Sequence, residues 1–548
     1  MLKLNKVIFS YKVNGKIYTV STVDSVENRR TALILDKDGD IFTARIRSNT
    51  PIEIIRLSAE FRYDFPADAK IFLNGYQSWT DSREYDINGR MRGTDQIPAA
   101  VLEKYALAAY GDYTFVKYSR RNGCLHGFSY GYIRHDIGSF DFIGSLNESD
   151  GFTIIRTDTA NSTVTAAKDC KNLHITNEYK GISLYLGSGS ENEVFDRYFE
   201  LMGISPCREK PIFGYTSWYR HYQNISEDII MKDLDGLENS GMKADVFQID
   251  DGYQLAVGDW LCIDKSKFPG SMKSIADRIK YMGMTPGIWL APFVCEEKSA
   301  VCAEHPERLL KDKRGLPVKC GNNWSGFYAL DIYNDDVRDY LRNVFDIIVN
   351  DWGFGLLKLD FLYAACILPR RDKTRGEVMS DAMDLLRECA GSAKILACGV
   401  PLASAFGKAE YCRIGPDVSL DWNDKSYMQL LHRERPSTRN TILNSVFRRH
   451  LNGRAFINDP DVFLLRYHNI AMTDAQKKCL AEINALTGGV LFTSDNLGEY
   501  GDTQKKIIEE MNGLREAKVL SAELRGNLLA LSVEKDGRND LKLYSAGF

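Results

Sequence analysis

The sequence contains no run of about 18 uncharged apolar residues, so none of its segments predicts a transmembrane helix. Its charges nearly cancel, with 70 lysines and arginines against 74 aspartates and glutamates and a formal net charge of -4. That balance lacks the electrostatic signature of a protein that binds nucleic acid or an anionic membrane. The first residues also lack the apolar stretch and cleavage site of a secretory signal, so we expect a cytoplasmic protein.

Histidine is scarce, and the cysteines form no regular pattern. The eight histidines include no HxxxH or HExxH array, which weakens any prediction of a zinc site. The twelve cysteines include no CxxC pair, so reduced thiols are expected rather than a disulfide framework. Magnesium or calcium held by carboxylates stays open on these grounds. The chemistry considered below needs no metal and no organic cofactor.

The first 190 or so residues consist of short alternating or β-branched runs, separated by Asn, Asp and Gly. Such a pattern favours an antiparallel β-sandwich. Asn14 and Gly15 predict a hairpin turn between the first two runs. The period becomes helical over 191–203, and Pro206 and Pro211 then indicate a domain boundary. The predicted strands are 6–11, 17–22, 32–35, 41–46, 53–61, 114–118, 151–157, 162–166 and 182–186.

From Pro211 onward, short apolar strands alternate with longer amphipathic segments, which is typical of βα units around a parallel sheet. Eight strands in about 300 residues favour a (β/α)8 barrel. A doubly wound sheet is the alternative, but no GxGxxG or GxxxxGK[ST] loop follows a strand. We therefore expect a β-sandwich over 1–205, a barrel over 206–515 and a small antiparallel β-domain over 516–548. The predicted barrel strands are 212–218, 245–249, 285–291, 355–361, 394–398, 411–414, 454–457 and 489–493.

A barrel carries its reactive groups at the carboxyl ends of its strands. Carboxylates recur at these places in the sequence, and their convergence on one pocket is electrostatically costly unless a ligand or cation uses them. The strand ends in question are Asp250-Asp251-Gly252-Tyr253, Lys358-Leu359-Asp360, Cys398-Gly399-Val400-Pro401, Arg413-Ile414-Gly415-Pro416-Asp417 and Asn458-Asp459-Pro460-Asp461.

Lys358 and Asp360 lie two residues apart, so a strand places both side chains on one face, here the barrel interior. A neighbouring ammonium keeps a carboxylate ionised, as a nucleophile requires. Asp417 follows Gly and Pro on a loop, and a second carboxyl across a cleft is the arrangement of retaining glycosidases. The alternatives are a structural ion pair for Lys358 and Asp360, and a solvated or helix-capping role for Asp417.

Asp250 and Asp251 are adjacent, so only a turn at the strand end lets both reach one ligand. They suit hydrogen bonds to sugar hydroxyls better than metal binding, although a helix-capping role stays open. Tryptophans provide flat apolar faces for sugar rings, but most single tryptophans serve core packing. The stacking candidates are Trp79, Trp218, Trp260 and Trp289, of which Trp79 stands out because it lies in a turn-rich polar segment of the first domain.

Nine short motifs resemble, in order and spacing, those of glycoside hydrolase family 36, which contains microbial α-galactosidases. The resemblance covers about residues 70 to 500. Four of the nine motifs are strand ends named above: 358–360, 398–401, 413–417 and 458–461. The other five are Gly75-Tyr76-Gln77-Ser78-Trp79, Gly214-Tyr215-Thr216-Ser217-Trp218-Tyr219, Ile249-Asp250-Asp251-Gly252-Tyr253, Gly287-Ile288-Trp289-Leu290-Ala291-Pro292 and Thr374-Arg375-Gly376-Glu377.

The resemblance implies an N-terminal β-supersandwich, a central (β/α)8 barrel and a small C-terminal β-domain. It implies Asp360 as nucleophile and Asp417 as general acid/base. It further implies substrate-binding roles for Trp79, Trp218, Asp250, Asp251, Trp289, Lys358, Cys398 and Arg413, with Trp79 reaching the site from the first domain.

The leading hypothesis is a retaining exo-α-galactosidase that acts on oligosaccharides. An α-N-acetylgalactosaminidase or an α-galactosyl transglycosylase on the same site are alternatives, and a non-catalytic carbohydrate-binding protein is a third class. The expected partner is a small-molecule carbohydrate, with no nucleic acid and no membrane, and we expect a dimer or tetramer.

Overall fold

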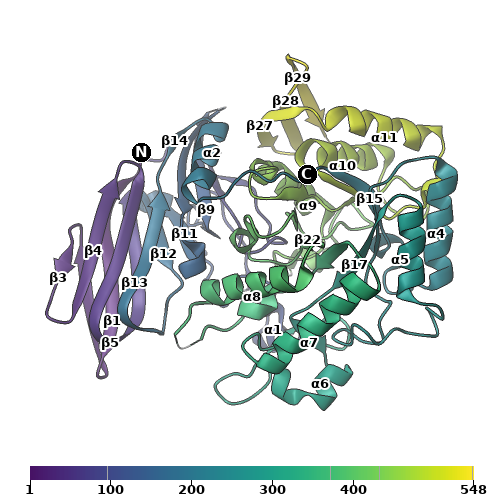
Figure 1. Cartoon of the computed structure of the whole chain (residues 1–548). Coiled ribbons are helices and arrows are strands. Elements are labelled where there is room, and N and C mark those ends of the chain that lie inside the picture. The colour runs from purple at the N-terminus through teal and green to yellow at the C-terminus, as the bar shows by residue number, and fades with distance from the viewer. Residues whose placement is uncertain (95–96, 137, 371, 431, 546, 548) are drawn as a thin grey trace.

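The computed structural model describes residues 1–94, 97–136, 138–370, 372–430, 432–545 and 547, and Figure 1 shows them as three parts in chain order. An antiparallel β-domain comes first, a parallel β/α barrel follows, and a small antiparallel sheet ends the chain. The predicted fold class is thereby confirmed. The three domain limits given above stay predictions.

The N-terminal domain is one hydrogen-bonded sheet of 14 strands whose described pairs are antiparallel. Asn14 and Gly15 form the first turn, both with positive φ, which is the geometry of a tight hairpin. The strands are β1 Lys3–Val13, β2 Lys16–Thr22, β3 Val26–Glu27, β4 Thr31–Asp38, β5 Ile41–Arg62, β6 Lys70–Leu73, β7 Glu84–Asp86, β8 His126–Phe128, β9 Tyr130–Asp136, β10 Ser139–Ser145, β11 Thr153–Asp158, β12 Thr163–Lys168, β13 Leu173–Tyr185 and β14 Ser188–Gly189.

The long strand β5 holds the parts of this domain together, because it pairs with four other strands: β1, β4, β12 and β13. It joins two runs, 41–46 and 53–61, that the sequence pattern predicts as separate strands. Even-numbered side chains such as Ala44 and Ile54 are buried in the first part of the strand, and odd-numbered ones such as Leu57 and Ala59 in the second part. An irregularity in the pairing with β1, between Ile54 and Arg56, shifts the hydrophobic period of two by one residue at this point.

The predicted strand over 114–118 is wrong, since this segment is a loop. Its aromatic rings pack on side chains of β8, Phe115 on Phe128 and Tyr118 on His126, but its backbone joins no strand. The Arg375 guanidinium lies 3.2 Å from the centre of the Phe115 ring, and the Tyr118 hydroxyl donates to Asp112 Oδ1 at 2.7 Å. The alternating pattern here therefore reflects side chains that pack on β8 and on Arg375 of the barrel, without a place in the sheet.

The barrel sheet is parallel throughout its described pairs, with the strand order β24-β23-β22-β21-β17-β16-β15-β26-β25. All eight predicted strands are present. They are β15 Ile212–Thr216, β16 Val246–Ile249, β17 Thr285–Leu290, β21 Leu356–Leu359, β22 Lys394–Ala397, β23 Tyr411–Arg413, the pair β24 Ile457–Asp459 and β25 Val462–Phe463, and β26 Val490–Thr493.

The seventh strand is split, and the split closes the barrel. Only Pro460 and Asp461 separate β24 from β25, yet β24 pairs with β23 and β25 pairs with β26. Pro460 has no N–H to donate, and Asp461 has a φ of 72°, so the ladder is interrupted between them. The strand also starts at Ile457, three residues later than the predicted 454, because residues 453–455 form a turn.

Helices surround the parallel sheet, and many begin at a Ser, Thr or Asn cap, as helix starts usually do. No helix among the described residues has the length and apolar character to cross a membrane. The helices are α1 Ala99–Lys104, α2 Glu191–Leu201, α3 Trp218–His221, α4 Glu227–Ser240, α5 Met272–Tyr281, α6 Ala300–Glu304, α7 Asp335–Asp346, α8 Arg375–Ala390, α9 Thr438–Phe447, α10 Asp474–Thr487 and α11 Asp502–Leu514.

Two small sheets complete the fold. The first follows β17 and comprises β18 Val294–Glu296, β19 Lys319–Gly321 and β20 Phe327–Ala329. The C-terminal one comprises β27 Lys518–Arg525, β28 Leu528–Lys535 and β29 Arg538–Tyr544, and lies beside α10 and α11 in Figure 1. The Tyr544 hydroxyl donates to Glu482 Oε2 on α10 at 2.7 Å, which attaches this sheet to the barrel.

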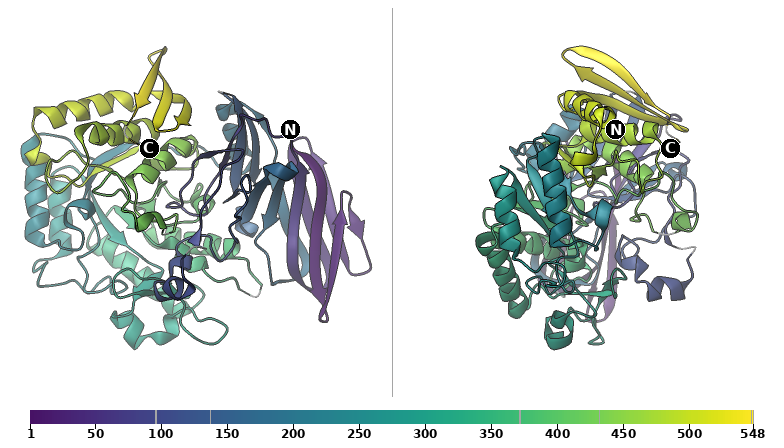
Figure 2. Two further views of the ribbon diagram at one scale, coloured as in Figure 1. Left: turned by 180° about the vertical axis from the view of Figure 1, so that it is seen from behind. Right: turned by 90° about the vertical axis from the view of Figure 1, so that its right-hand side faces the viewer.

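The N-terminal domain lies beside the barrel, as the left view in Figure 2 shows. Its loop 74–79 enters the interface, where Ser78 N donates to Val400 O at 2.9 Å. Arg448, fully buried just after α9, donates to Asn74 Oδ1 at 2.9 Å and to carbonyls of the same loop. It also donates to Ile414 O at 2.9 Å, so one guanidinium joins the two domains.

We expect Arg448→Met to destabilise the protein, because it leaves several buried acceptors without a donor. Each such group costs roughly 1–3 kcal/mol, which predicts a clearly lower melting temperature in differential scanning calorimetry. Arg278→Met is the matched control, since Arg278 pairs with Asp235 and Glu238 at the surface, where ion pairs contribute little. Equal melting temperatures for both variants would contradict the role given to Arg448.

Candidate active site

One cavity of about 650 Å³ opens where the barrel strands end. This volume is typical of small-molecule sites. Eight of the ten predicted site residues line it: Trp79, Trp218, Asp250, Asp251, Trp289, Lys358, Asp360 and Asp417. The other two, Cys398 and Arg413, are buried behind this lining and hydrogen-bond to members of it. The structure thus brings all ten together.

Asp360 follows β21 directly and is held by two donors. Trp289 Nε1 donates to its Oδ2 at 3.1 Å, and Phe361 N donates to its Oδ1 at 2.9 Å. Phe361 has a φ of 54°, a strained conformation that turns the chain just after the carboxylate. Burial raises the pKa of Asp360, the ammonium of Lys358 lowers it, and the nearby carboxylate of Asp417 raises it again.

Lys358 makes its ion pair with Asp250, not with Asp360 as its position two residues away suggests. Its Nζ lies 2.8 Å from Asp250 Oδ2, and both side chains are buried. Burial alone would lower the pKa of Lys358, but Asp250 overrides it and the pKa is raised. Lys358 therefore acts on Asp360 as a nearby charge, without a direct bond.

Asp250 and Asp251 both face the cavity because β16 ends at Ile249 and the chain turns there. Gln248 Nε2 donates to Asp250 Oδ2 at 2.8 Å. Asp251 accepts from Gln254 Nε2 at 2.6 Å and from Trp324 Nε1 at 2.8 Å, while burial raises its pKa. The turn needed for both carboxylates to reach one ligand is thus present.

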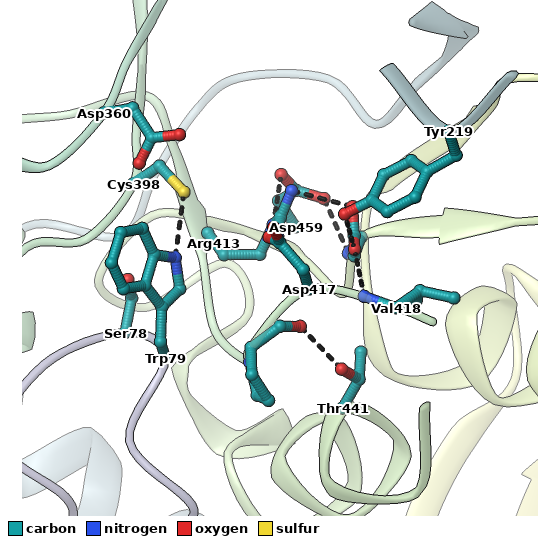
Figure 3. Close-up of polar contacts among 12 residues, drawn as sticks. Ser78, Trp79, Tyr219, Asp360, Cys398, Arg413, Asp417, Val418, Thr441 and Asp459 are labelled. Carbon is teal, nitrogen blue, oxygen red and sulfur yellow. Dashed lines mark hydrogen bonds and ion pairs between the residues drawn. The ribbon is translucent and has the colours of Figure 1, made fainter. Parts of the chain in front are cut away.

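Asp417 lies on the loop after β23, with 38% of its side chain exposed. Arg413 holds it, with Nη1 2.8 Å from Asp417 Oδ1. The same guanidinium reaches Asp459 Oδ2 at 3.3 Å and Asp461 Oδ1 at 2.7 Å. Figure 3 shows this guanidinium among the carboxylates. One buried cation therefore serves three acids, an arrangement that the sequence pattern does not reveal.

Trp79 comes from the N-terminal domain and lies against the barrel wall. Its Nε1 donates to Cys398 Sγ at 3.2 Å, and Figure 3 shows Cys398 between Trp79 and Asp360. Burial raises the pKa of the Cys398 thiol well above its usual value, so this sulfur stays protonated. Trp79 also meets Phe361 edge to face, with ring centres 5.1 Å apart. The inner wall of the cavity is therefore built by both domains.

Comparison with known proteins points to one group of enzymes. The sequence model of the Melibiase family matches residues 204–374. The structure of TtGalA, an α-galactosidase from Thermus thermophilus described in complex with p-nitrophenyl α-D-galactopyranoside, superimposes with a TM-score of 0.73 at 27% identity. That match covers 94% of this chain and 98% of TtGalA. The chain is similar to α-galactosidases, in the case of TtGalA over almost the whole of both chains.

Curated family relatives match a shorter stretch. The α-galactosidase Mel36A of Lactobacillus acidophilus is 27% identical over 141 residues, which are 24% of this chain and 18% of Mel36A. An α-galactosidase of Escherichia coli is 30% identical over 168 residues, 29% of this chain and 23% of that protein. The aligned parts thus cover less than a quarter of these relatives. The family 36 α-galactosidase AgaA of Geobacillus stearothermophilus shares the fold at 12% identity, with a TM-score of 0.63.

Several residues of this family 36-like site escape prediction from the sequence. Trp324 lies between β19 and β20, lines the cavity and holds Asp251. Tyr110 of the N-terminal domain also lines it, stacks on His432 with ring centres 5.0 Å apart, and accepts from Asn322 N at 2.9 Å. A tryptophan in the polar segment Asn322-Asn323-Trp324 is the same signal that singles out Trp79, and it identifies Trp324 equally well.

One group of potential metal ligands occurs in the described part of the chain. It comprises His305, Glu307 and Asp336, whose ligand atoms lie within 4.8 Å of one another. Glu307 and Asp336 are exposed, and none of the three lines the cavity. A surface cluster of this kind is common without an ion and adds nothing to the chemistry of the cavity.

We expect Lys358→Met to lower the melting temperature strongly, because it leaves the buried Asp250 carboxylate without its cation. Breaking a buried pair from one side typically costs about 3–5 kcal/mol. Adding Asp250→Asn should restore part of the loss, since the uncompensated charge is then gone. Lys273→Met, in an exposed pair with Asp277, is the control and should melt nearly as the wild type does. If the double variant is no more stable than Lys358→Met alone, the ion pair between Lys358 and Asp250 does not contribute in this way.

Proposed function

We propose that the chain is a retaining exo-α-galactosidase, which releases terminal α-galactosyl residues from oligosaccharides through a covalent glycosyl-aspartate intermediate. The observation that carries this proposal is the shared cavity of Asp360 and Asp417, with Asp250 and Asp251 in its wall. The likeness to TtGalA supports it, since that enzyme is described in complexes with p-nitrophenyl α-D-galactopyranoside and with stachyose.

The proposed reaction has two steps. First, an oxygen of Asp360 attacks the anomeric carbon, the bond to the leaving oxygen breaks, and Asp417 gives that oxygen its proton. Then Asp417 takes a proton from water, whose oxygen attacks the same carbon and frees Asp360. Each step inverts the configuration, so the product retains it.

Asp360 must be ionised to attack, although burial opposes its charge. Lys358 and the indole N–H of Trp289 favour the anion, and so supply what the reaction needs. Asp250 and Asp251 can accept hydrogen bonds from sugar hydroxyls, each worth roughly 1.5–3 kcal/mol for a charged acceptor. Bonds of this strength distinguish the axial 4-hydroxyl of galactose from an equatorial one.

Galactose is favoured over N-acetylgalactosamine by the packing of one wall. Trp79 and Cys398 are already in contact, and a Cβ added at Gly399 would lie 2.9 Å from the Trp79 ring. The family resemblance implies that this wall flanks the sugar 2-position, where an N-acetyl group needs extra space. Transglycosylation on the same site depends on how well an acceptor competes with water and stays a second candidate.

Asp360→Ala should lower turnover by a factor on the order of 10⁴ or more, because no covalent intermediate forms. Added azide should then cleave an activated aryl α-galactoside and yield the β-galactosyl azide. In Asp417→Ala the azide instead attacks the glycosyl ester, so its product keeps the α configuration. The two products are identified by proton NMR. Turnover like that of the wild type in Asp360→Ala, or the α-azide from that variant, would refute its role as nucleophile.

The proposed specificity is tested with three p-nitrophenyl glycosides: the α-galactoside, the α-N-acetylgalactosaminide and the α-glucoside. We expect kcat/KM for the galactoside to exceed that for the glucoside by at least about 100-fold, because misplaced hydroxyls leave Asp250 and Asp251 unpaired. If kcat/KM is higher for the N-acetylgalactosaminide than for the galactoside, the protein is an α-N-acetylgalactosaminidase instead. Binding of galactose in calorimetry without release from any substrate would indicate a non-catalytic binding protein.

A further inference from the structure

The segment Asn458–Asp461 carries two acids, and the mechanism above uses neither of them. Asp461 is nearly fully buried next to the site. Its Oδ2 accepts from Val418 N at 2.7 Å and from the Tyr219 hydroxyl, and its Oδ1 lies 2.7 Å from Arg413 Nη2. Asp461 thus contacts both the arginine that holds Asp417 and the residue that follows Asp417.

We propose that Asp461 is a positioning residue that fixes Arg413 and limits the hold of Arg413 on the acid/base carboxylate Asp417. This inference rests on the proposed function, because it gives Asp417 the role of proton donor. Asp461 itself lines no part of the cavity and touches no reacting atom.

The charge count around Arg413 explains why such a device is needed. An arginine 2.8 Å from Asp417 favours the carboxylate anion, whereas a general acid must carry a proton. Asp461 and Asp459 also form ion pairs with this guanidinium, which weakens its attraction for Asp417. In addition, the negative charge of Asp461 repels a negative charge on Asp417. Both effects help Asp417 to keep its proton until the leaving oxygen takes it.

The groups around the two acids are consistent with this account. Asp461 faces Arg413, Asp417, Asp459 and Tyr219, while Asp417 also faces Asp360, Cys398 and Tyr222. Burial raises the pKa of Asp461 to about 7, with Arg413 opposing and the neighbouring carboxylates adding to the rise. Asp461 is therefore largely ionised above neutral pH, where the proton of a general acid is lost.

The test uses Asp461→Asn, which keeps the shape of the side chain and tolerates the positive φ at this position. We expect the alkaline limb of kcat/KM to move to lower pH by on the order of 1 unit, because Arg413 then acts on Asp417 more strongly. At pH 8, hydrolysis of melibiose should fall at least 10-fold more than hydrolysis of an aryl galactoside that needs little protonation.

Asp495→Asn is the matched control. Asp495 is likewise buried, pairs with Arg466 at 2.7 Å and accepts from the Tyr500 hydroxyl at 2.7 Å, but lines no part of the cavity. It should lower the melting temperature without moving the alkaline limb or changing the ratio between the two substrates. The inference is wrong if Asp461→Asn behaves like this control. It is also wrong if Asp461→Asn moves the alkaline limb of kcat/KM to higher pH.

A second readout needs no substrate. A carboxyl whose pKa is raised on folding gives stability that is present below its unfolded value and lost as pH rises through the folded value. The melting temperature of the wild type should therefore fall relative to Asp461→Asn between pH 5 and pH 8. If the melting temperature of the wild type instead rises relative to that of Asp461→Asn over this pH range, the charge state assigned to Asp461 is wrong. Absence of galactosidase activity in the wild type, by contrast, refutes the proposed function itself.

Discussion

Compensation of buried charge is the constraint on which this site depends. Asp250, Asp360 and Asp461 are buried, and each carboxylate lies near a cation, either Lys358 or Arg413. Taking one ion out of water costs several kcal/mol, so neither cation can be removed alone without loss of stability. Lys358 also lowers the pKa of Asp360, and Arg413 that of Asp461, so the fold and the chemistry rest on the same contacts.

The barrel supplies this arrangement through the ends of its strands. Asp250, Asp360 and Arg413 lie at or just after the ends of β16, β21 and β23. The seventh strand contributes two carboxylates, Asp459 and Asp461, which both contact the guanidinium of Arg413. They lie two residues apart on either side of Pro460, a spacing that places both side chains on one face of a strand. The seventh strand thus provides the second and third partners of Arg413.

Local patterns in the sequence predict the strand ends, and with them Asp250, Asp251, Asp360 and Asp417, because each depends only on the residues beside it. The partner of Lys358 is not local, since Asp250 lies 108 residues away in the chain. For the same reason, the sequence does not predict the hydrogen bonds by which Arg448 joins the two domains, or the packing of the segment 114–118. The predicted start of the seventh strand is too early because Ala455 and Phe456 are apolar and buried, although Ala455 belongs to a turn and Phe456 forms only an isolated bridge with Asn452.

The loop that carries Trp79 has a consequence for how such enzymes can be recombined. A barrel produced from a shortened gene would keep its acids but lack one side of its cavity, and Arg448 would lose most of its acceptors. Exchange of barrels between homologues therefore has to carry the matching N-terminal loop along. The two domains have to be transferred together, although the chain passes from one to the other only once.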